Sequence, residues 1–232
     1  MNFPGIIGTG VHALQWYMEQ LQELSRSAEG KDVILPTKII GIPFTPINTL
    51  LPYQMEKAGE QLFPYFEEME RFNNAPYILA NITLHEALDK MKSTFTPSTH
   101  FIHLSDLLKE QPIAEGEKIM VIGTEYTMTH NYIPRLLLLS YPRIKIVRPT
   151  QDEIEKLDEL RTLFYSTPSP EKAKIVFNGI LENHPDTTFV IACTEHALAL
   201  KYIEDQSRFI NLPKEQCRAL LTSYKNMTHV AP

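Results

Sequence analysis

The sequence predicts an α/β protein of two similar lobes, each with a parallel sheet of about four strands flanked by helices. Two observations predict this fold. Short apolar runs typical of strands alternate with segments of helical periodicity along the 232 residues. Two strand-end motifs also recur, in the same order, in both halves of the chain. We therefore expect a pseudo-two-fold relation between the lobes, with a cleft between them.

In the first half, two strand-like runs each lead into a helical pattern. The run "PGIIGTG" precedes "ALQWYMEQLQELSRSA", where apolar residues recur at the three- and four-residue spacing of a helix. The run "APYILAN" precedes "TLHEALDKMK", which is again helical. These segments cover residues 4–10, 13–28, 75–81 and 83–92.

The second half repeats the alternation three times. "KIMVIGTE" leads into "YIPRLLLL", "RIKIVRP" leads into "TQDEIEKLDELRTLFY", and "TTFVIAC" leads into "EHALALKYI". The sequence predicts Thr150 as the N-cap of the middle helix, because a threonine followed by acidic residues is typical of a helix start. These segments cover residues 118–125, 132–139, 143–149, 150–165, 187–193 and 195–203.

The motifs that recur in the two halves predict where a ligand would bind. "IIGTG" matches "VIGTE", and "YILAN" matches "FVIAC". Gly8 and Asn81 are 73 positions apart, and Gly123 and Cys193 are 70 apart. Ligands of open α/β sheets bind beyond the carboxyl ends of the strands, where all four motifs fall. The sequence therefore predicts that these four loops line the cleft.

Composition excludes several classes of protein. The net charge is −6 with no basic cluster, which disfavours nucleic acid and anionic membranes as partners. The apolar stretch "RLLLLSYP" is far shorter than the roughly 20 residues of a membrane span, and "MNFPGIIG" lacks the features of a signal peptide. The two cysteines show no metal-ligand spacing, so we expect no disulfide, no zinc site and a cytoplasmic location.

The motifs "GIIGTG", "ANITLHEALDKM", "VIGTEYTM" and "ACTEHALAL", in this order, resemble the aspartate racemase branch of the aspartate/glutamate racemase superfamily. The resemblance implies a C-terminal segment that returns to the first lobe. The lobes would then comprise residues 1–98 with 210–232, and residues 99–209. It also implies an amino acid or other small carboxylate as ligand, no cofactor, no metal, and the homodimer common in the family.

The chemistry that the resemblance implies needs two thiols, one on each face of the substrate. One thiolate removes the α-proton and one thiol returns a proton. Cys193 matches the second thiol. Asn81, or Ala80 in another alignment, stands where the first belongs, and neither residue is a base. Cys217 lies in a helical pattern and is a poor substitute.

The remaining candidates are polar residues of the four loops. Glu195 is either the partner of the thiol or of a substrate amine, or a solvated carboxylate in the first turn of a helix. Threonine hydroxyls and free helix-start N–H groups together suit a carboxylate. His85, His130 and His196 are interpreted as packing or surface histidines rather than bases. The predicted substrate-binding residues are Thr9, Asn81, Thr83, Thr124, Thr127 and Thr194.

The basic residues with which aspartate racemases bind a side-chain carboxylate are not matched here, and "IPFTPINTLLPY" favours an apolar or aromatic side group. Three hypotheses follow. The first is a cofactor-independent racemase or isomerase that acts through Cys193. The second is a one-cysteine enzyme of the arylmalonate decarboxylase type. The third is a non-catalytic protein that binds a carboxylate.

Overall fold

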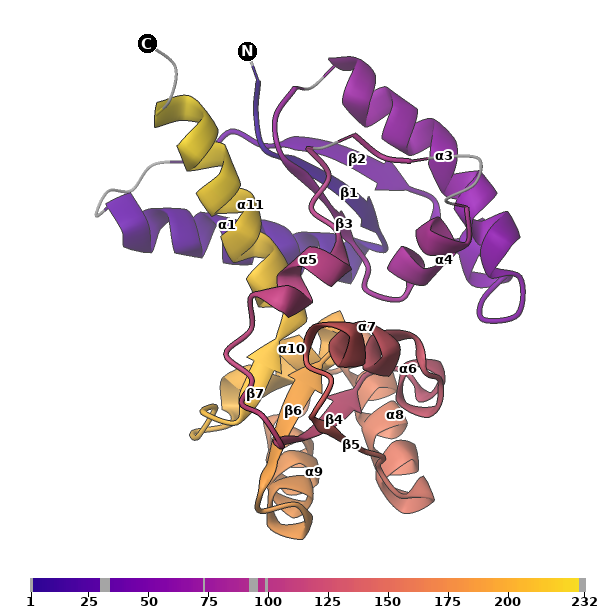
Figure 1. Ribbon diagram of the computed structural model, residues 1–232, viewed down its shortest axis with the longest axis vertical. Coiled ribbons are helices and arrows are strands. Elements are labelled where there is room, and N and C mark those ends of the chain that lie inside the picture. Colours follow the sequence, from indigo (N-terminus) through magenta and orange to yellow (C-terminus); the bar gives the residue numbers. More distant parts are fainter. Residues whose placement is uncertain (1, 30–33, 73, 92–95, 99, 230–232) are drawn as a thin grey trace. The chain divides into compact units, whose positions relative to one another are not determined.

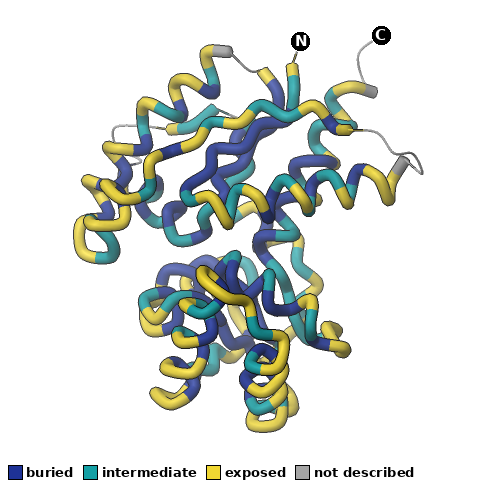
Figure 2. Tube along the Cα trace, turned by 180° about the vertical axis from the view of Figure 1, so that it is seen from behind, coloured by how far each residue is buried: buried dark blue, intermediate teal, exposed yellow. Residues whose placement is uncertain are grey.

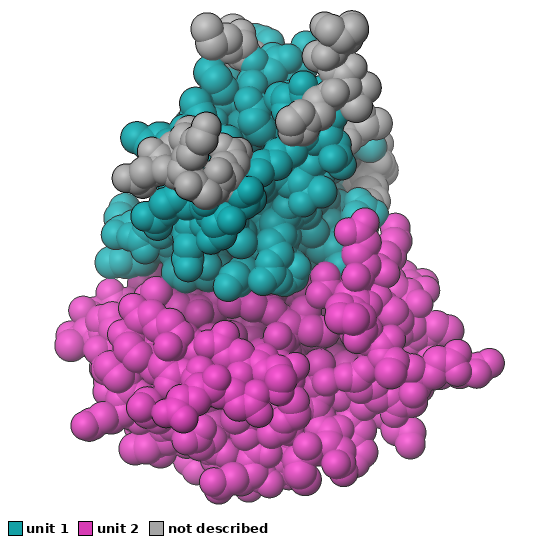
Figure 3. Space-filling model, turned by 90° about the vertical axis from the view of Figure 1, so that its left-hand side faces the viewer, with its two compact units in different colours: residues 1–107, 214–232 teal, residues 108–213 magenta. Residues whose placement is uncertain are grey.

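The chain forms two compact units in a computed structural model (Figure 3). Unit 1 comprises residues 1–107 and 214–232, and unit 2 comprises residues 108–213. The structure describes residues 2–29, 34–72, 74–91, 96–98 and 100–229. Each unit is described by itself.

Unit 1 has a parallel sheet of three strands, β1 (Gly5–Thr9), β2 (Lys38–Ile42) and β3 (Tyr77–Ala80), in the order β2-β1-β3 (Figure 1). Among the described residues this is one strand fewer than the sequence predicted. A single parallel bridge joins Tyr77 to Phe101 where a fourth strand was expected. The chain begins helix α5 (Leu104–Lys109) three residues later, which leaves too little extended chain for a ladder.

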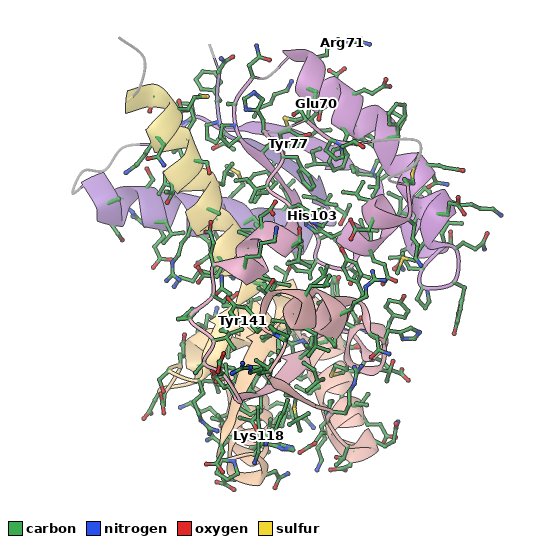
Figure 4. The ribbon with its side chains drawn as sticks, in the orientation of Figure 1. Glu70, Arg71, Tyr77, His103, Lys118 and Tyr141 are labelled. Carbon is green, nitrogen blue, oxygen red and sulfur yellow. The ribbon has the colours of Figure 1, made fainter. Side chains whose placement is uncertain are left out.

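Helices α1 (Val11–Glu29) and α3 (Met55–Phe72) pack against this sheet, and α4 (Leu84–Lys90) packs on α3. Unit 1 also contains α2 (Phe44–Asn48) and α11 (Leu212–His229). α11 crosses α1 in Figure 1, and the hydroxyl of Tyr17 on α1 donates a hydrogen bond to Gln216 on α11. On α3, Glu70 accepts a hydrogen bond from the hydroxyl of Tyr77 in β3 (Figure 4).

Unit 2 has the predicted four-stranded parallel sheet. Its strands are β4 (Lys118–Ile122), β5 (Lys145–Val147), β6 (Thr187–Ile191) and β7 (Phe209–Asn211), in the order β5-β4-β6-β7. The two central strands, β4 and β6, are almost entirely buried. Such continuous apolar runs are expected for parallel strands that are covered on both faces. Figure 2 shows buried residues in the interior of each unit.

Two helices of unit 2 begin where the sequence predicted them, at Tyr132 and directly after Thr150, whereas the helix Pro170–Asn183 was not predicted. Thr150 caps α8 with a reciprocal pair of hydrogen bonds to Glu153, so this cap is confirmed. No helix of the described residues is long and apolar enough to cross a membrane. The helical segments are α6 (Glu125–Thr129), α7 (Tyr132–Ser140), α8 (Gln151–Ser166), α9 (Pro170–Asn183), α10 (Thr194–Ala199) and the short 3₁₀ helix η1 (Leu200–Tyr202).

Candidate functional site at the carboxyl ends of the strands

Cys193 and Glu195 form a buried pair in unit 2. Cys193 follows the end of β6 by two residues and is the N-cap residue of α10. Its thiol donates a hydrogen bond to Oε2 of Glu195 at 2.7 Å. Cys193 is 7% exposed and Glu195 is 8% exposed, so little water reaches either group. Glu195 is therefore a partner of the thiol and not a solvated carboxylate.

The surroundings keep this thiol protonated. Burial raises the pKa of Cys193 well above its usual value, and the charge of Glu195 and the hydrogen bond to it raise the pKa further. Hydrogen bonds from the backbone N–H groups of His196 and Glu195 lower the pKa of the thiol, as expected at a helix start. Their effect is smaller than that of burial and Glu195. These surroundings favour the protonated thiol over the thiolate at neutral pH.

Two residues of α8 complete this cluster and were missed by the sequence analysis. The hydroxyl of Tyr165 donates a hydrogen bond to Glu195. The guanidinium of Arg161 is held by Asp158 through Nε at 2.8 Å and interacts electrostatically with both Cys193 and Glu195. Residues four apart share one face of a helix, so the sequence placed Arg161 and Tyr165 together. It carried no signal that this face meets Cys193.

The loop after β4 contributes two linked hydroxyls. Thr124 is the N-cap of α6, and its Oγ1 accepts from the backbone N–H of Thr127 at 3.2 Å. The two hydroxyls also lie 2.9 Å apart within hydrogen-bonding distance. Gly123 permits this turn, because a Cβ there would lie 3.0 Å from the Cβ of Thr127. Thr194 is the first residue of α10, beside the thiol.

In unit 1, Thr9 and Asn81 are joined at the ends of neighbouring strands. Nδ2 of Asn81 donates to Oγ1 of Thr9 at 2.9 Å, and Oδ1 accepts from the backbone N–H of Leu84 at 3.2 Å. Asn81 therefore supports the start of α4, whereas the Thr83 side chain makes no capping bond. The position at which the resemblance places a first thiol holds a neutral amide with two structural hydrogen bonds.

The histidines are placed as the sequence predicted for packing residues. His196 is buried and its Nε2 lies 3.0 Å from the carbonyl of Leu157; burial lowers its pKa to about 4. Burial also lowers the pKa of His85, whose Nδ1 accepts from the backbone of Leu104. His130 is exposed, and its ring stacks on Tyr126 with the ring centroids 3.9 Å apart.

Cys217 lies in α11 and is fully buried. Burial raises the pKa of its thiol, and both cysteines are free. Within the described ranges, no cluster of three or more His, Cys, Asp or Glu side chains has the arrangement of a metal site.

Comparison with solved structures identifies the architecture. An aspartate racemase homologue from Pyrococcus horikoshii superposes with a TM-score of 0.76 over 97% of this chain and 100% of that one, at 19% identity. The chain has the fold of the aspartate/glutamate racemases. No family model and no curated protein matches the sequence.

Two further structures with the racemase fold support this assignment. The aspartate racemase of Picrophilus torridus gives a TM-score of 0.71 at 17% identity, covering 97% of this chain and 95% of its own. Glutamate racemase RacE1 of Bacillus anthracis gives 0.62 at 19% identity, covering 97% and 82%. The fold that the four motifs implied is therefore confirmed.

Proposed function

We propose that this chain is a cofactor-independent enzyme of the racemase fold. It would act on a small carboxylate and transfer a proton through Cys193 to one face of the substrate only. The hydrogen bond from the Cys193 thiol to Glu195 carries the proposal, because it presents a protonated thiol in a site that is nearly closed to water. Such a thiol is suited to protonate a carbanion.

The proton transfer balances as follows. A carbanion forms next to the carboxylate when a carbon–carbon bond to a second carboxylate breaks and carbon dioxide leaves with the electron pair remaining on carbon. The Cys193 S–H proton then passes to that carbon and leaves a thiolate. A proton from solvent then passes to the thiolate, with the adjacent Glu195 carboxylate accepting it and handing it on, so that the net change is the loss of carbon dioxide and the gain of one proton by the product.

Arg161 and the hydroxyls of Thr124, Thr127 and Thr194 are the proposed carboxylate-binding groups of unit 2. A guanidinium binds a carboxylate through a fork of N–H donors, and a threonine hydroxyl adds a neutral donor. Binding by these groups stabilises the negative charge that builds up near the carboxylate as the carbanion forms.

Asn81 argues against racemisation of an amino acid. Racemisation by proton transfer needs a group that exchanges a proton on each face, and an amide does not exchange a proton at neutral pH. The contributions of Thr9, Asn81 and Thr83 to ligand binding stay predictions, as do the homodimer and the cytoplasmic location.

Deuterium incorporation tests the proposal. The protein is incubated in D₂O with a panel of amino acids, small carboxylates and arylmalonates, and mass spectrometry measures decarboxylation and deuterium at the α-carbon. At least one compound is expected to react with the natural chain and with Cys217→Ala, and none with Cys193→Ala. If Cys193→Ala retains the natural rate, the thiol is not the proton donor. If no compound of the panel reacts but carboxylates bind, the non-catalytic hypothesis replaces this one.

A further inference from the structure

The side chain of Tyr165 connects the buried pair of Cys193 and Glu195 to the surface of unit 2. Its hydroxyl donates a hydrogen bond to Glu195, whose Oε2 accepts the hydrogen bond of the Cys193 thiol at 2.7 Å. Cys193 is 7% exposed and Glu195 is 8% exposed, whereas Tyr165 is 42% exposed. Two consecutive hydrogen bonds therefore lead from a buried thiol to a residue that solvent reaches.

Packed helices hold these three side chains in place. Tyr165 lies in the last turn of α8 and Glu195 in the first turn of α10, and the two helices pack against each other. Nε2 of His196 on α10 lies 3.0 Å from the carbonyl oxygen of Leu157 on α8, which joins the helices at a second point. The hydrogen bond between Tyr165 and Glu195 thus has both of its ends on helices of the core and does not depend on a loop.

The hydroxyl of Tyr165 is suited to pass a proton. A phenol both donates and accepts hydrogen bonds, so its oxygen takes a proton from water as it gives its own proton to a neighbouring acceptor. Burial and the negative charge of Glu195 raise the pKa of Tyr165, so the phenol keeps its proton in the resting chain. Arg161, which also lies near the pair, has only N–H donors and does not pass a proton in this way.

The proposed reaction requires the Cys193 thiol to regain its proton after each turnover. Loss of that proton leaves a thiolate beside the carboxylate of Glu195, and two like charges so close together in a buried site are unfavourable. A ligand held against the sulfur covers it on the ligand's side. A path through Glu195 and Tyr165 would restore the thiol without passing the ligand.

We propose that Tyr165, Glu195 and Cys193 form a proton relay, in which Tyr165 passes solvent protons to the thiol through Glu195. Glu195 takes the hydroxyl proton of Tyr165 and hands it to the thiolate sulfur, while the hydroxyl oxygen takes a proton from solvent. The sulfur gains one proton, solvent loses one, and Glu195 and Tyr165 return to their starting states. The inference rests on the proposed function in taking Cys193 as the proton donor to a carbanion. Tyr165 is then a positioning residue that acts through Glu195 and not on the ligand.

Exchange of the thiol proton tests the relay without any substrate. In a Cys217→Ala background Cys193 carries the only thiol of the chain, and infrared spectroscopy follows the replacement of its S–H stretching band by the S–D band after transfer to D₂O. We expect Tyr165→Phe, which removes only the hydroxyl, to slow this exchange roughly tenfold or more, because a positioned proton-transfer group contributes about 10²–10⁴-fold. Urea unfolding of the same variant checks that it is folded under these conditions.

Tyr202→Phe is the matched control. Tyr202 is a half-buried tyrosine of unit 2 whose ring lies 6.3 Å, between centroids, from that of Phe164, the residue before Tyr165. We expect this variant to exchange at the rate of the Cys217→Ala parent. Equal exchange in Tyr165→Phe and the parent, or equal slowing by Tyr202→Phe, would overturn the inference. Faster exchange in Tyr165→Phe would overturn it too, because Tyr165 would then only shield the pair from water.

Product formation gives a second readout, which a purely structural role of Tyr165 would not produce. The first turnover uses the proton that Cys193 already carries, and only later turnovers need the relay. With a compound whose reaction depends on Cys193, Tyr165→Phe is expected to form its first product at the rate of the natural chain and later products roughly tenfold or more slowly. A first turnover slowed as much as the later ones would contradict the relay and assign Tyr165 to ligand binding or folding.

The two tests separate this inference from the proposed function. Slower exchange in Tyr165→Phe supports the relay even if no compound reacts with the natural chain, in which case the proposed function fails alone. Turnover that depends on Cys193, with unchanged exchange in Tyr165→Phe, leaves the proposed function standing and overturns the relay. Slower exchange with equal rates of early and late turnovers would also overturn it, because the thiol would then regain its proton by another path.

Discussion

At the scale of single residues, Glu195 lowers the reactivity of the Cys193 thiol. Its negative charge and its hydrogen bond both raise the pKa of the thiol, although burial is the larger cause. We expect Glu195→Gln to lower this pKa, because an uncharged amide no longer disfavours the thiolate. In a Cys217→Ala background, alkylation by iodoacetamide at pH 8 should become several-fold faster.

The control for this experiment is Glu215→Gln, which removes a carboxylate that raises the pKa of Cys217. It is expected to leave the labelling of Cys193 unchanged. In the natural chain, peptide mapping should find Cys193 labelled ahead of Cys217, since Cys193 is 7% exposed and Cys217 is fully buried. Slower alkylation after Glu195→Gln would show that Glu195 promotes the thiolate.

Buried His196 is expected to make the free energy of unfolding depend on pH. Its pKa of about 4 in the folded chain lies below the ordinary 6.5, because burial disfavours the charged ring. Between these two pH values the unfolded chain binds more protons than the folded chain. The contribution of His196 to the free energy of unfolding is therefore complete above pH 6.5 and is lost as the pH decreases toward 4. Glu195 and Asp158 favour the charged ring and Arg161 opposes it.

The loss due to His196 is expected to be about 3 kcal/mol over this range. Urea unfolding at several pH values measures it. His196→Gln should remove that part of the pH dependence, while His130→Gln should retain it because His130 is exposed. The same slope in both variants would assign the acid sensitivity to other groups, of which buried His85 is the next candidate.

Sequence patterns predicted the residues of each loop but not their partners. Cys193 and Thr124 were found because each follows an apolar strand and opens a helix. Arg161 and Tyr165 were not predicted, because they lie in the second half of a helix whose polar face has the pattern of a solvent-exposed surface. Which helix face meets which strand end is decided by packing between distant segments, and one sequence does not encode that pairing in a local pattern.

At the scale of elements, the turn from β4 into α6 depends on the close approach of Gly123. A Cβ at this position would lie 3.0 Å from two carbon atoms of Thr127, closer than ordinary packing permits. Gly123→Ala is therefore expected to destabilise the fold by about 1–3 kcal/mol. Urea unfolding checks this, with Gly41→Ala as control, since a Cβ there meets nothing within 4 Å. Equal stability of the two variants would show that the turn relaxes without cost.

Element boundaries were predicted well where caps and periodicity agree. The Thr150 capping box and the strands before Asn81 and Cys193 are examples. The fourth strand of the first sheet was expected by analogy with the second, and a single bridge at Phe101 stands there in the described chain. The similarity between the two halves predicts the strands that both sheets share. It does not predict that the first sheet lacks a fourth strand among the described residues.

At the scale of the whole molecule, the alternation of strands and helices predicted the α/β class, since parallel strands require helical crossovers, and the recurring motifs predicted the two lobes. The racemase fold does not by itself decide the reaction, because one fold hosts several chemistries. The two units differ at the strand ends where the resemblance expects a thiol. Cys193 presents a protonated thiol in unit 2, and Asn81 presents a structural amide in unit 1.

The stereochemistry of the product tests one-face proton transfer most directly. The compound with the fastest Cys193-dependent reaction is converted in D₂O, and chiral chromatography with mass spectrometry measures the enantiomers of the deuterated product. A single enantiomer in large excess is the expected result, together with no D-aspartate or D-glutamate from the L-forms. A product that is racemic from the first turnovers, or amino-acid racemisation at about one turnover per second or faster, would contradict the account and require a second proton-transfer group opposite Cys193.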